Sequence, residues 1–176
     1  MAKTVCSRFH ADYSVCVALI SDVHDARELR KSVMSGKFEA TLLNPEMILD
    51  EFQILVAANQ AINLHVLNKM VTKSLHSEIL YRLSPSKNIS DSFKKFGTGE
   101  NDKAVCVVIV NDKNKSTLDL ILNISQGKLT DLEKLANLTD MDKVKKIYKL
   151  TDEELSQSPM LDAIVSRIAS KDIVTI

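Results

Sequence analysis

The stretch FQILVAANQAI, residues 52–62, constrains the fold of this chain more than any other. Read at the helical period, it has one stripe of large apolar side chains, and its opposite side is also apolar. A helix that is apolar nearly all round is buried, so the sequence predicts a long core helix over about 50–70. The large stripe consists of Phe52, Leu55, Val56, Ile62 and Val66, and the opposite side of Ile54, Ala57, Ala58 and Ala61.

Two asparagines, Asn59 and Asn63, fall on the stripe of large side chains. A buried amide that finds no partner costs about 1–3 kcal/mol. We therefore expect Asn59 either to make a hydrogen bond inside the fold or to face a groove in which a ligand satisfies it.

Two short runs predict central strands, because they are apolar on both faces. They are VCVALI at 15–20 and KAVCVVIV at 103–110. Residues 4–9 are expected to pair with the first of them through a turn at 10–12. SEILYRL at 77–83 alternates between apolar and polar residues, which predicts a half-buried strand.

The shorter helices are predicted from side-chain caps and glycine stops. A helix is expected to begin at Asp22 and to end at Gly36, and another to run from Asn88 to Gly97. The last third of the chain has repeated cap signals, and its final helix begins at Pro159.

The chain has 176 residues, of which 45% are hydrophobic, which is enough for one domain with a sizeable core. No repeat or linker divides it, so we expect a single domain over 1–176. The predicted fold class is mixed α+β. A small, mostly antiparallel sheet of three to four strands is packed by a long buried helix and several shorter helices.

The charge balance excludes one class of function. There are 23 basic and 23 acidic residues, so the formal net charge is zero. A protein that coats nucleic acid or membrane through bulk electrostatics needs a large excess of one sign. A small local RNA site remains compatible with this composition.

The three cysteines, Cys6, Cys16 and Cys106, have no metal-like spacing, and the last two lie in apolar runs. This pattern favours free thiols in a reducing compartment. The first residues lack the apolar core of a signal peptide, and no apolar run approaches the ~20 residues that span a bilayer. We expect the protein in the cytoplasm and nucleus, with no membrane partner.

Catalytic motifs are missing from the sequence, which has only four glycines and no Gly-rich phosphate loop. We therefore expect no catalytic residue, no metal and no cofactor. A small hydrolase using His24, Asp25 or Glu78 is kept as an alternative. A solvated pair of His24 with Asp25, and a pairing of Glu78 with Arg82, are the more ordinary interpretations.

Two segments suit binding. SPSKNIS at 84–90 places a turn and a helix N-terminus beside Lys87, which suits a phosphate or carboxylate, although capping by Asn88 alone also explains it. KVKKIYKL at 143–150 has the pattern of a basic amphipathic helix. Such a helix binds RNA or an acidic partner, or is simply a solvated surface helix.

Four segments together resemble the TPRKB family, the small subunits of the KEOPS (EKC) complex that bind its PRPK-type kinase. They are FQILVAANQA, EILYRLSPSKNISDSFKKFG, KKIYKL and MLDAIVSRIASKD, and the resemblance runs from about residue 15 to about residue 174. It implies a single TPRKB-like domain that is an accessory protein and not an enzyme.

The resemblance also implies partners. The complex forms threonylcarbamoyladenosine at position 37 of tRNA. The subunit docks directly on the PRPK-type kinase, meets the catalytic threonylcarbamoyltransferase only indirectly, and in archaeal relatives grips the single-stranded 3′ CCA end. Splayed terminal bases can be held by a few hydrogen bonds and apolar contacts, which fits a neutral chain.

Candidate residues follow from the matched motifs. For kinase docking we expect an apolar patch on the last two helices with a charged rim, made of Lys146, Ile147, Leu150, Leu161, Ile164 and Arg167. For the tRNA 3′ end we expect Asn59, Lys69, Ser84, Lys87, Asn88 and Ile89. A stand-alone RNA-binding protein is the second alternative.

Overall fold

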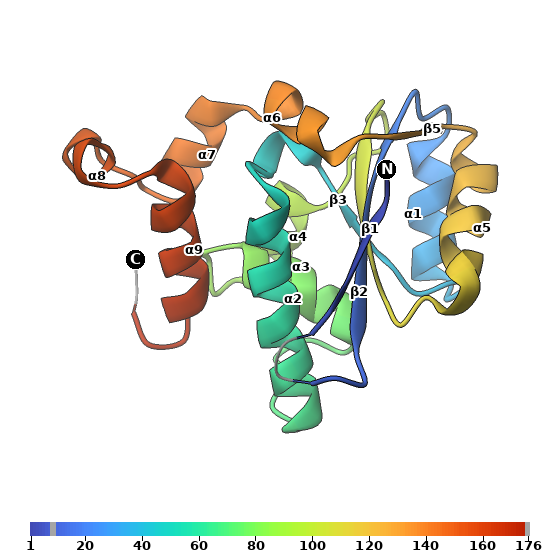
Figure 1. The fold of residues 1–176 in the computed structure, drawn as a ribbon, viewed down its shortest axis with the longest axis horizontal. Helices are drawn as coiled ribbons and strands as arrows, with labels where there is room; N and C mark the ends of the chain where they lie inside the picture. The colour runs from blue at the N-terminus through green and yellow to red at the C-terminus, as the bar shows by residue number, and fades with distance from the viewer. Residues whose placement is uncertain (8–9, 175–176) are drawn as a thin grey trace.

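A computed structural model describes residues 1–7 and 10–174, and its elements form four layers, one of which is an antiparallel sheet (Figure 1). Two helices cover one face of the sheet and three cover the other, and a further helix lies outside those three. The first pair are α1 (Ala26–Met34) and α5 (Ser116–Ser125). The three are α2 (Glu51–Val66), α3 (Leu75–Leu83) and α4 (Ile89–Phe96), and the outer helix is α9 (Met160–Ser170).

The sheet has the strand order β1-β2-β4-β3, with β5 also paired to β2. All four strand pairings are antiparallel. The strands are β1 (Lys3–Cys6), β2 (Ser14–Ser21), β3 (Thr41–Leu43), β4 (Val105–Val110) and β5 (Lys128–Thr130). The predicted fold class is confirmed, as are the two apolar central strands.

Both faces of β2 are buried, as its unbroken apolar run requires. Val15, Val17 and Leu19 belong to the core under α2. Ala18 and Ile20 belong to the second core, under α1 and α5. The predicted pairing of the N-terminal strand is present over Lys3–Cys6; the remainder of that expected strand includes residues 8 and 9, which lie outside the described residues.

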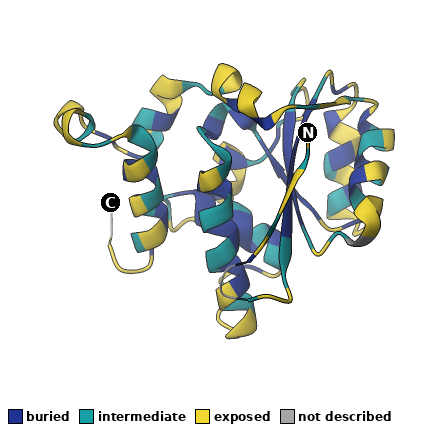
Figure 2. Cartoon of the chain, in the orientation of Figure 1, coloured by how far each residue is buried: buried dark blue, intermediate teal, exposed yellow. Residues whose placement is uncertain are grey.

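The long core helix is present, but it is not buried all round, contrary to what its apolar character led us to expect. Phe52 is 50% exposed and Val66 44% exposed. The fully buried side is the one with small residues, so that α2 lies close to its neighbours (Figure 2). It consists of Gln53, Ile54, Ala57, Ala58, Ala61 and Ile62.

The expected strand at 77–83 is also wrong, because these residues form helix α3. Ser74 and Ser77 cap its first turn reciprocally, and Glu78 pairs with Arg82 one turn later at 2.8 Å. An i,i+4 ion pair and a capping box are helical signals. Burial on several sides of this short helix made its pattern look like alternation.

The remaining helices refine the expected boundaries. The N-cap of α1 is Asp25 and not Asp22, since the Asp25 side chain accepts from the Glu28 N–H, and Gly36 follows its end at φ +73°. The expected helix from the Asn88 cap to Gly97 is confirmed as α4. The short segments are the 3₁₀ turns Pro45–Met47, Lys113–Lys115 and Leu132–Lys134, and helices α6 (Leu135–Leu138), α7 (Met141–Ile147) and α8 (Asp152–Gln157).

Segment α6 to α8 crosses one end of the molecule and leads into α9 (Figure 1). Helix α9 then packs along α2. Within the described chain, none of the helices has the length and apolar character of a membrane span.

Candidate binding surfaces

A cavity of about 300 Å³ opens where the α3–α4 loop, α4 and the end of α7 meet. Three of its lining residues are lysines and one is an aspartate. Its wall consists of Ser84, Pro85, Ser86, Lys87, Asp91, Lys95, Ile147 and Lys149, and we call it the loop pocket.

The loop that forms its floor is held by hydrogen bonds within itself. Ser86 N–H donates to Ser84 Oγ at 3.2 Å, and Asn88 N–H donates to Ser86 Oγ at 3.1 Å. Asn88 Oδ1 in turn accepts from the Asp91 N–H at 2.9 Å and so caps α4. The loop therefore has a defined shape before any ligand arrives.

The charge of the loop pocket is positive. Asp91 is paired with Lys95 at 2.9 Å, and the hydrogen bond from this lysine lowers the pKa of the carboxyl. Lys87 and Lys149 are exposed beside this neutral pair. A pocket of this size and sign suits a phosphate or carboxylate group.

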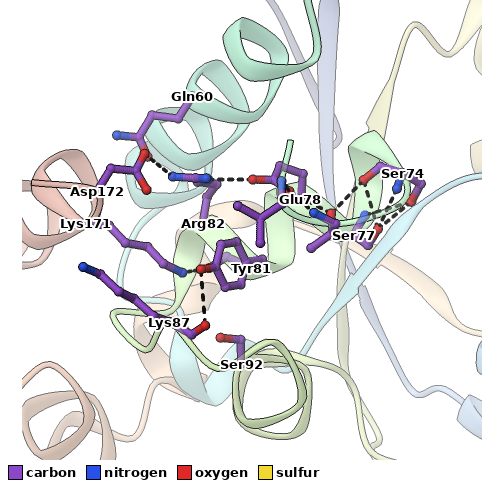
Figure 3. A network of polar contacts seen from close by, with 12 residues as sticks. Gln60, Ser74, Ser77, Glu78, Tyr81, Arg82, Lys87, Ser92, Lys171 and Asp172 are labelled. Carbon is purple, nitrogen blue, oxygen red and sulfur yellow. Dashed lines mark hydrogen bonds and ion pairs between the residues drawn. The ribbon is translucent and has the colours of Figure 1, made fainter. Parts of the chain in front are cut away.

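A network of polar contacts connects α3 to the residues that follow α9 (Figure 3). Arg82 is almost fully buried and donates to Glu78 at 2.8 Å and to Asp172 at 2.5 Å. Glu78 also accepts from Thr72 Oγ1 and from the Val71 and Thr72 N–H groups, at 2.8 to 3.0 Å. Its oxygens are thus fully used in the fold, which argues against a catalytic role for Glu78.

Lys171 is the unusual member of this network. It is 2% exposed, its Nζ lies 3.3 Å from the ring centroid of Tyr81, and it donates to the Tyr81 carbonyl. Burial, with the cationic Arg82 and Lys87 nearby, lowers the pKa of its ammonium to about 7, against the opposing effect of Asp172 and Glu78. Lys171 thus titrates near neutral pH.

A pH dependence of stability follows. Between about pH 7 and pH 10 the unfolded chain holds a proton on Lys171 that the folded chain has lost, so the free energy of unfolding rises with pH, by up to about 1.4 kcal/mol per unit. Lys171→Met removes this contribution. Urea titrations at several pH values should show the wild-type stability rising relative to Lys171→Met; a difference that stays flat or falls with pH contradicts the lowered pKa.

The predicted RNA-binding residues do not all come together. Ser84 and Lys87 line the loop pocket, and Asn88 and Ile89 begin the adjoining α4. Asn59 lies instead on α2, where its Nδ2 donates to the Leu55 carbonyl at 2.9 Å and its Oδ1 accepts from Ser7 Oγ at 2.7 Å. Lys69 is exposed beyond the end of α2 and is not part of the pocket wall.

The fully buried amide of α2 is Gln53, which sequence reasoning missed. Its Oε1 accepts from the Leu49 N–H at 3.0 Å, and its Nε2 donates to the Met47 carbonyl at 3.2 Å and to the Tyr148 hydroxyl at 3.0 Å. Asn59 is half-buried and already has two partners. The question that the sequence raised about Asn59 therefore has a local structural answer, a bond that ties α2 to the N-terminal segment.

The predicted kinase-docking residues divide into exposed and core positions. Leu150 is 5% exposed and Ile164 0% exposed, so the patch cannot include their side chains while the chain keeps this fold. Arg167 is half-buried and holds Glu154 of α8 through two hydrogen bonds of 2.6 and 2.7 Å. We call the accessible remainder the α9 surface, made of Lys146 and Ile147 of α7 and Leu161 and Arg167 of α9. Ile147 also lines the loop pocket, so the two surfaces adjoin.

His24 and Asp25, which were named for the hydrolase alternative, are not paired in a catalytic arrangement within the described residues. His24 is exposed, and the Asp25 carboxylate beside it caps α1. In the described part of the chain, no group of three or more His, Cys, Asp or Glu side chains could hold a metal ion. The three cysteines are free, and Cys16 and Cys106 are buried.

The fold and its surfaces define a small α+β domain with a positively charged pocket beside a helical surface of mixed apolar and basic residues. The model of the family described as kinase binding protein CGI-121 matches residues 20–172. The chain belongs to this family.

Named relatives agree with this assignment. The chain is 44% identical to the EKC/KEOPS complex subunit TPRKB of Danio rerio over 166 residues, which are 94% of each chain. It is 34% identical to the EKC/KEOPS complex subunit cgi121 of Aspergillus fumigatus over 145 residues, covering 77% of this chain and 76% of the relative. The corresponding subunit of Yarrowia lipolytica is 29% identical over 141 residues, 79% of this chain and 81% of the relative.

Proposed function

We propose that this chain is a non-catalytic subunit of a KEOPS/EKC complex and that it docks on the PRPK-type kinase subunit. In this complex it helps to recruit the 3′ CCA end of tRNA for formation of threonylcarbamoyladenosine at position 37. The observation that carries the proposal is its membership of a kinase-binding family whose matched region extends through α9. The complex acts in the cytoplasm and nucleus, where the free thiols stay reduced.

The α9 surface is the proposed kinase interface. It combines half-buried Leu161 and Ile147 with a rim of Lys146 and Arg167. An apolar centre with a polar rim, in which arginine is enriched, is typical of stable protein interfaces. The bond of Arg167 to Glu154 holds α8 against α9 and fixes the shape of this surface before docking.

Leu161→Asp should weaken kinase binding at least about tenfold, because it places a charge in the apolar centre of the interface. Met34→Asp is the matched control, since Met34 is an exposed apolar residue on α1, across the sheet from α9 (Figure 1). Co-elution of each variant with the kinase in gel filtration measures the difference. If Leu161→Asp binds as well as Met34→Asp, the kinase docks elsewhere.

The loop pocket is the proposed site for a phosphate of the tRNA 3′ end. The residues of the RNA set that the fold places in or beside this pocket are Ser84, Lys87, Asn88 and Ile89. The exposed Ile89 offers an apolar surface for a terminal base, next to the lysines that attract its phosphate. Few such contacts are needed, which agrees with the zero net charge.

Lys87→Ala should weaken tRNA binding to the assembled complex and reduce the salt dependence of the binding constant by about one unit of slope. Lys31→Ala, at an exposed position of α1, should change neither quantity. Titrations with labelled tRNA at several salt concentrations test both variants. Equal effects of the two substitutions would remove the loop pocket from the proposal.

A further inference from the structure

A path of contacts connects the segment at the C-terminal end of α9 to the loop pocket, through Lys171, Tyr81 and Lys87 (Figure 3). The path begins just after α9, where Lys171 lies over the Tyr81 ring and donates to the Tyr81 carbonyl. It ends at the pocket, because the Tyr81 hydroxyl donates to the backbone carbonyl of Lys87 at 3.4 Å. Tyr81 is thus the one residue in this path that contacts both ends.

The C-terminal end of α9, where this path begins, is held against α3 and α2 by polar contacts. Asp172 bridges to the buried Arg82 at 2.5 Å, and Gln60 on α2 donates to the Ala169 carbonyl at 3.1 Å. A shift of α9 relative to α2 would therefore move Lys171 against Tyr81. In a close-packed interior such displacements are passed to contacting groups and are not absorbed.

The path ends at the α3–α4 loop, whose conformation is restrained by hydrogen bonds within the loop. Ser84 is fully buried, and three successive hydrogen bonds connect it through Ser86 to the α4 cap at Asn88. Ser92 Oγ adds a further bond to the Asn88 carbonyl at 2.8 Å. The position of the Lys87 carbonyl consequently affects the whole floor of the loop pocket.

The charges at the two ends of the path, on Lys171 and Lys87, also interact. Lys87 is one of the cations that disfavour the charged form of Lys171, together with Arg82, whereas Glu78 and Asp172 favour it. An anion held beside Lys87 would reduce this repulsion. Ligand in the pocket would therefore favour the charged form of Lys171, which lies over the Tyr81 ring.

We infer that Tyr81 and Lys171 are positioning residues that couple docking on the α9 surface to the geometry of the loop pocket. Each event then favours the other, because coupling between two binding sites is reciprocal. The inference rests on the proposed function, in which the kinase occupies one surface and the tRNA end the other.

Hydrogen exchange in the complex with the kinase tests this coupling. The Ser86 and Asn88 amides report on the loop, since each donates to a serine hydroxyl. Kinase docking should slow their exchange by about fivefold or more in the wild-type chain. In Tyr81→Phe, which keeps the ring under Lys171 and loses the bond to Lys87, α9 should still be protected while the loop amides no longer respond. Tyr13→Phe, on the N-terminal side of the fold, should behave as the wild type.

The outcomes are distinct. Protection of α9 without any response of the loop in the wild type overturns the coupling and leaves docking intact. An equal response of the loop in the wild type and in Tyr81→Phe shows that the path does not run through Tyr81, which also overturns it. No protection of α9 in the wild type removes the proposed docking surface, and the coupling with it.

Discussion

Glu78→Ala is expected to lower the free energy of unfolding by about 3–5 kcal/mol, because it leaves Arg82 as a buried charge without its main partner. Glu78 is completely buried and accepts the Arg82 Nε–H at 2.8 Å. The other partner of Arg82, Asp172, is largely exposed and cannot replace it. The same substitution also removes the acceptor of the Val71 and Thr72 N–H groups.

Urea denaturation measures this loss, and Asp91→Ala is its control. Asp91 forms an ion pair of the same i,i+4 spacing with Lys95, but on the surface. Such exposed pairs contribute about 0–1 kcal/mol. Equal losses from the two substitutions would mean that the buried network does not carry the stability assigned to it.

Gln53→Leu is expected to cost about 3 kcal/mol, since it removes three hydrogen bonds and leaves the Leu49 N–H and the Met47 carbonyl without their side-chain partner. The third bond is to the Tyr148 hydroxyl, which keeps its bond to the Leu83 carbonyl. Leucine is similar in volume, so the loss reports missing hydrogen bonds and not a cavity.

Gln60→Leu is the matched control on the same helix. Gln60 is half-buried and donates a hydrogen bond to the Ala169 carbonyl, and its Oε1 has no partner among the described residues. Chemical denaturation should show a loss for Gln60→Leu that is smaller by about 2 kcal/mol. A reversed order would contradict the assignment of Gln53 as the central polar residue of α2.

Local signals in the sequence were sufficient where one residue decides the structure. The Asn88 cap and the Gly97 stop located α4, and the apolar runs located β2 and β4. The position of the loop pocket was foreseen at Ser84 and Lys87 for the same reason, because a helix N-terminus beside a lysine is a local pattern.

Features that depend on tertiary packing were not predictable in this way. An α2 helix apolar on every side does not reveal which side is buried, so Asn59 was favoured over Gln53. Strands β3 and β5 have three residues each and are too short for a periodic signal. Lys95 and Lys149 complete the loop pocket only because α4 and the end of α7 meet there.

Calorimetric titration of the intact chain into its PRPK-type kinase tests the central claim most directly. We expect one-to-one binding and a negative change in heat capacity, because docking removes the apolar part of the α9 surface from water. If no binding is seen under conditions in which both proteins are folded, the kinase-docking role is contradicted.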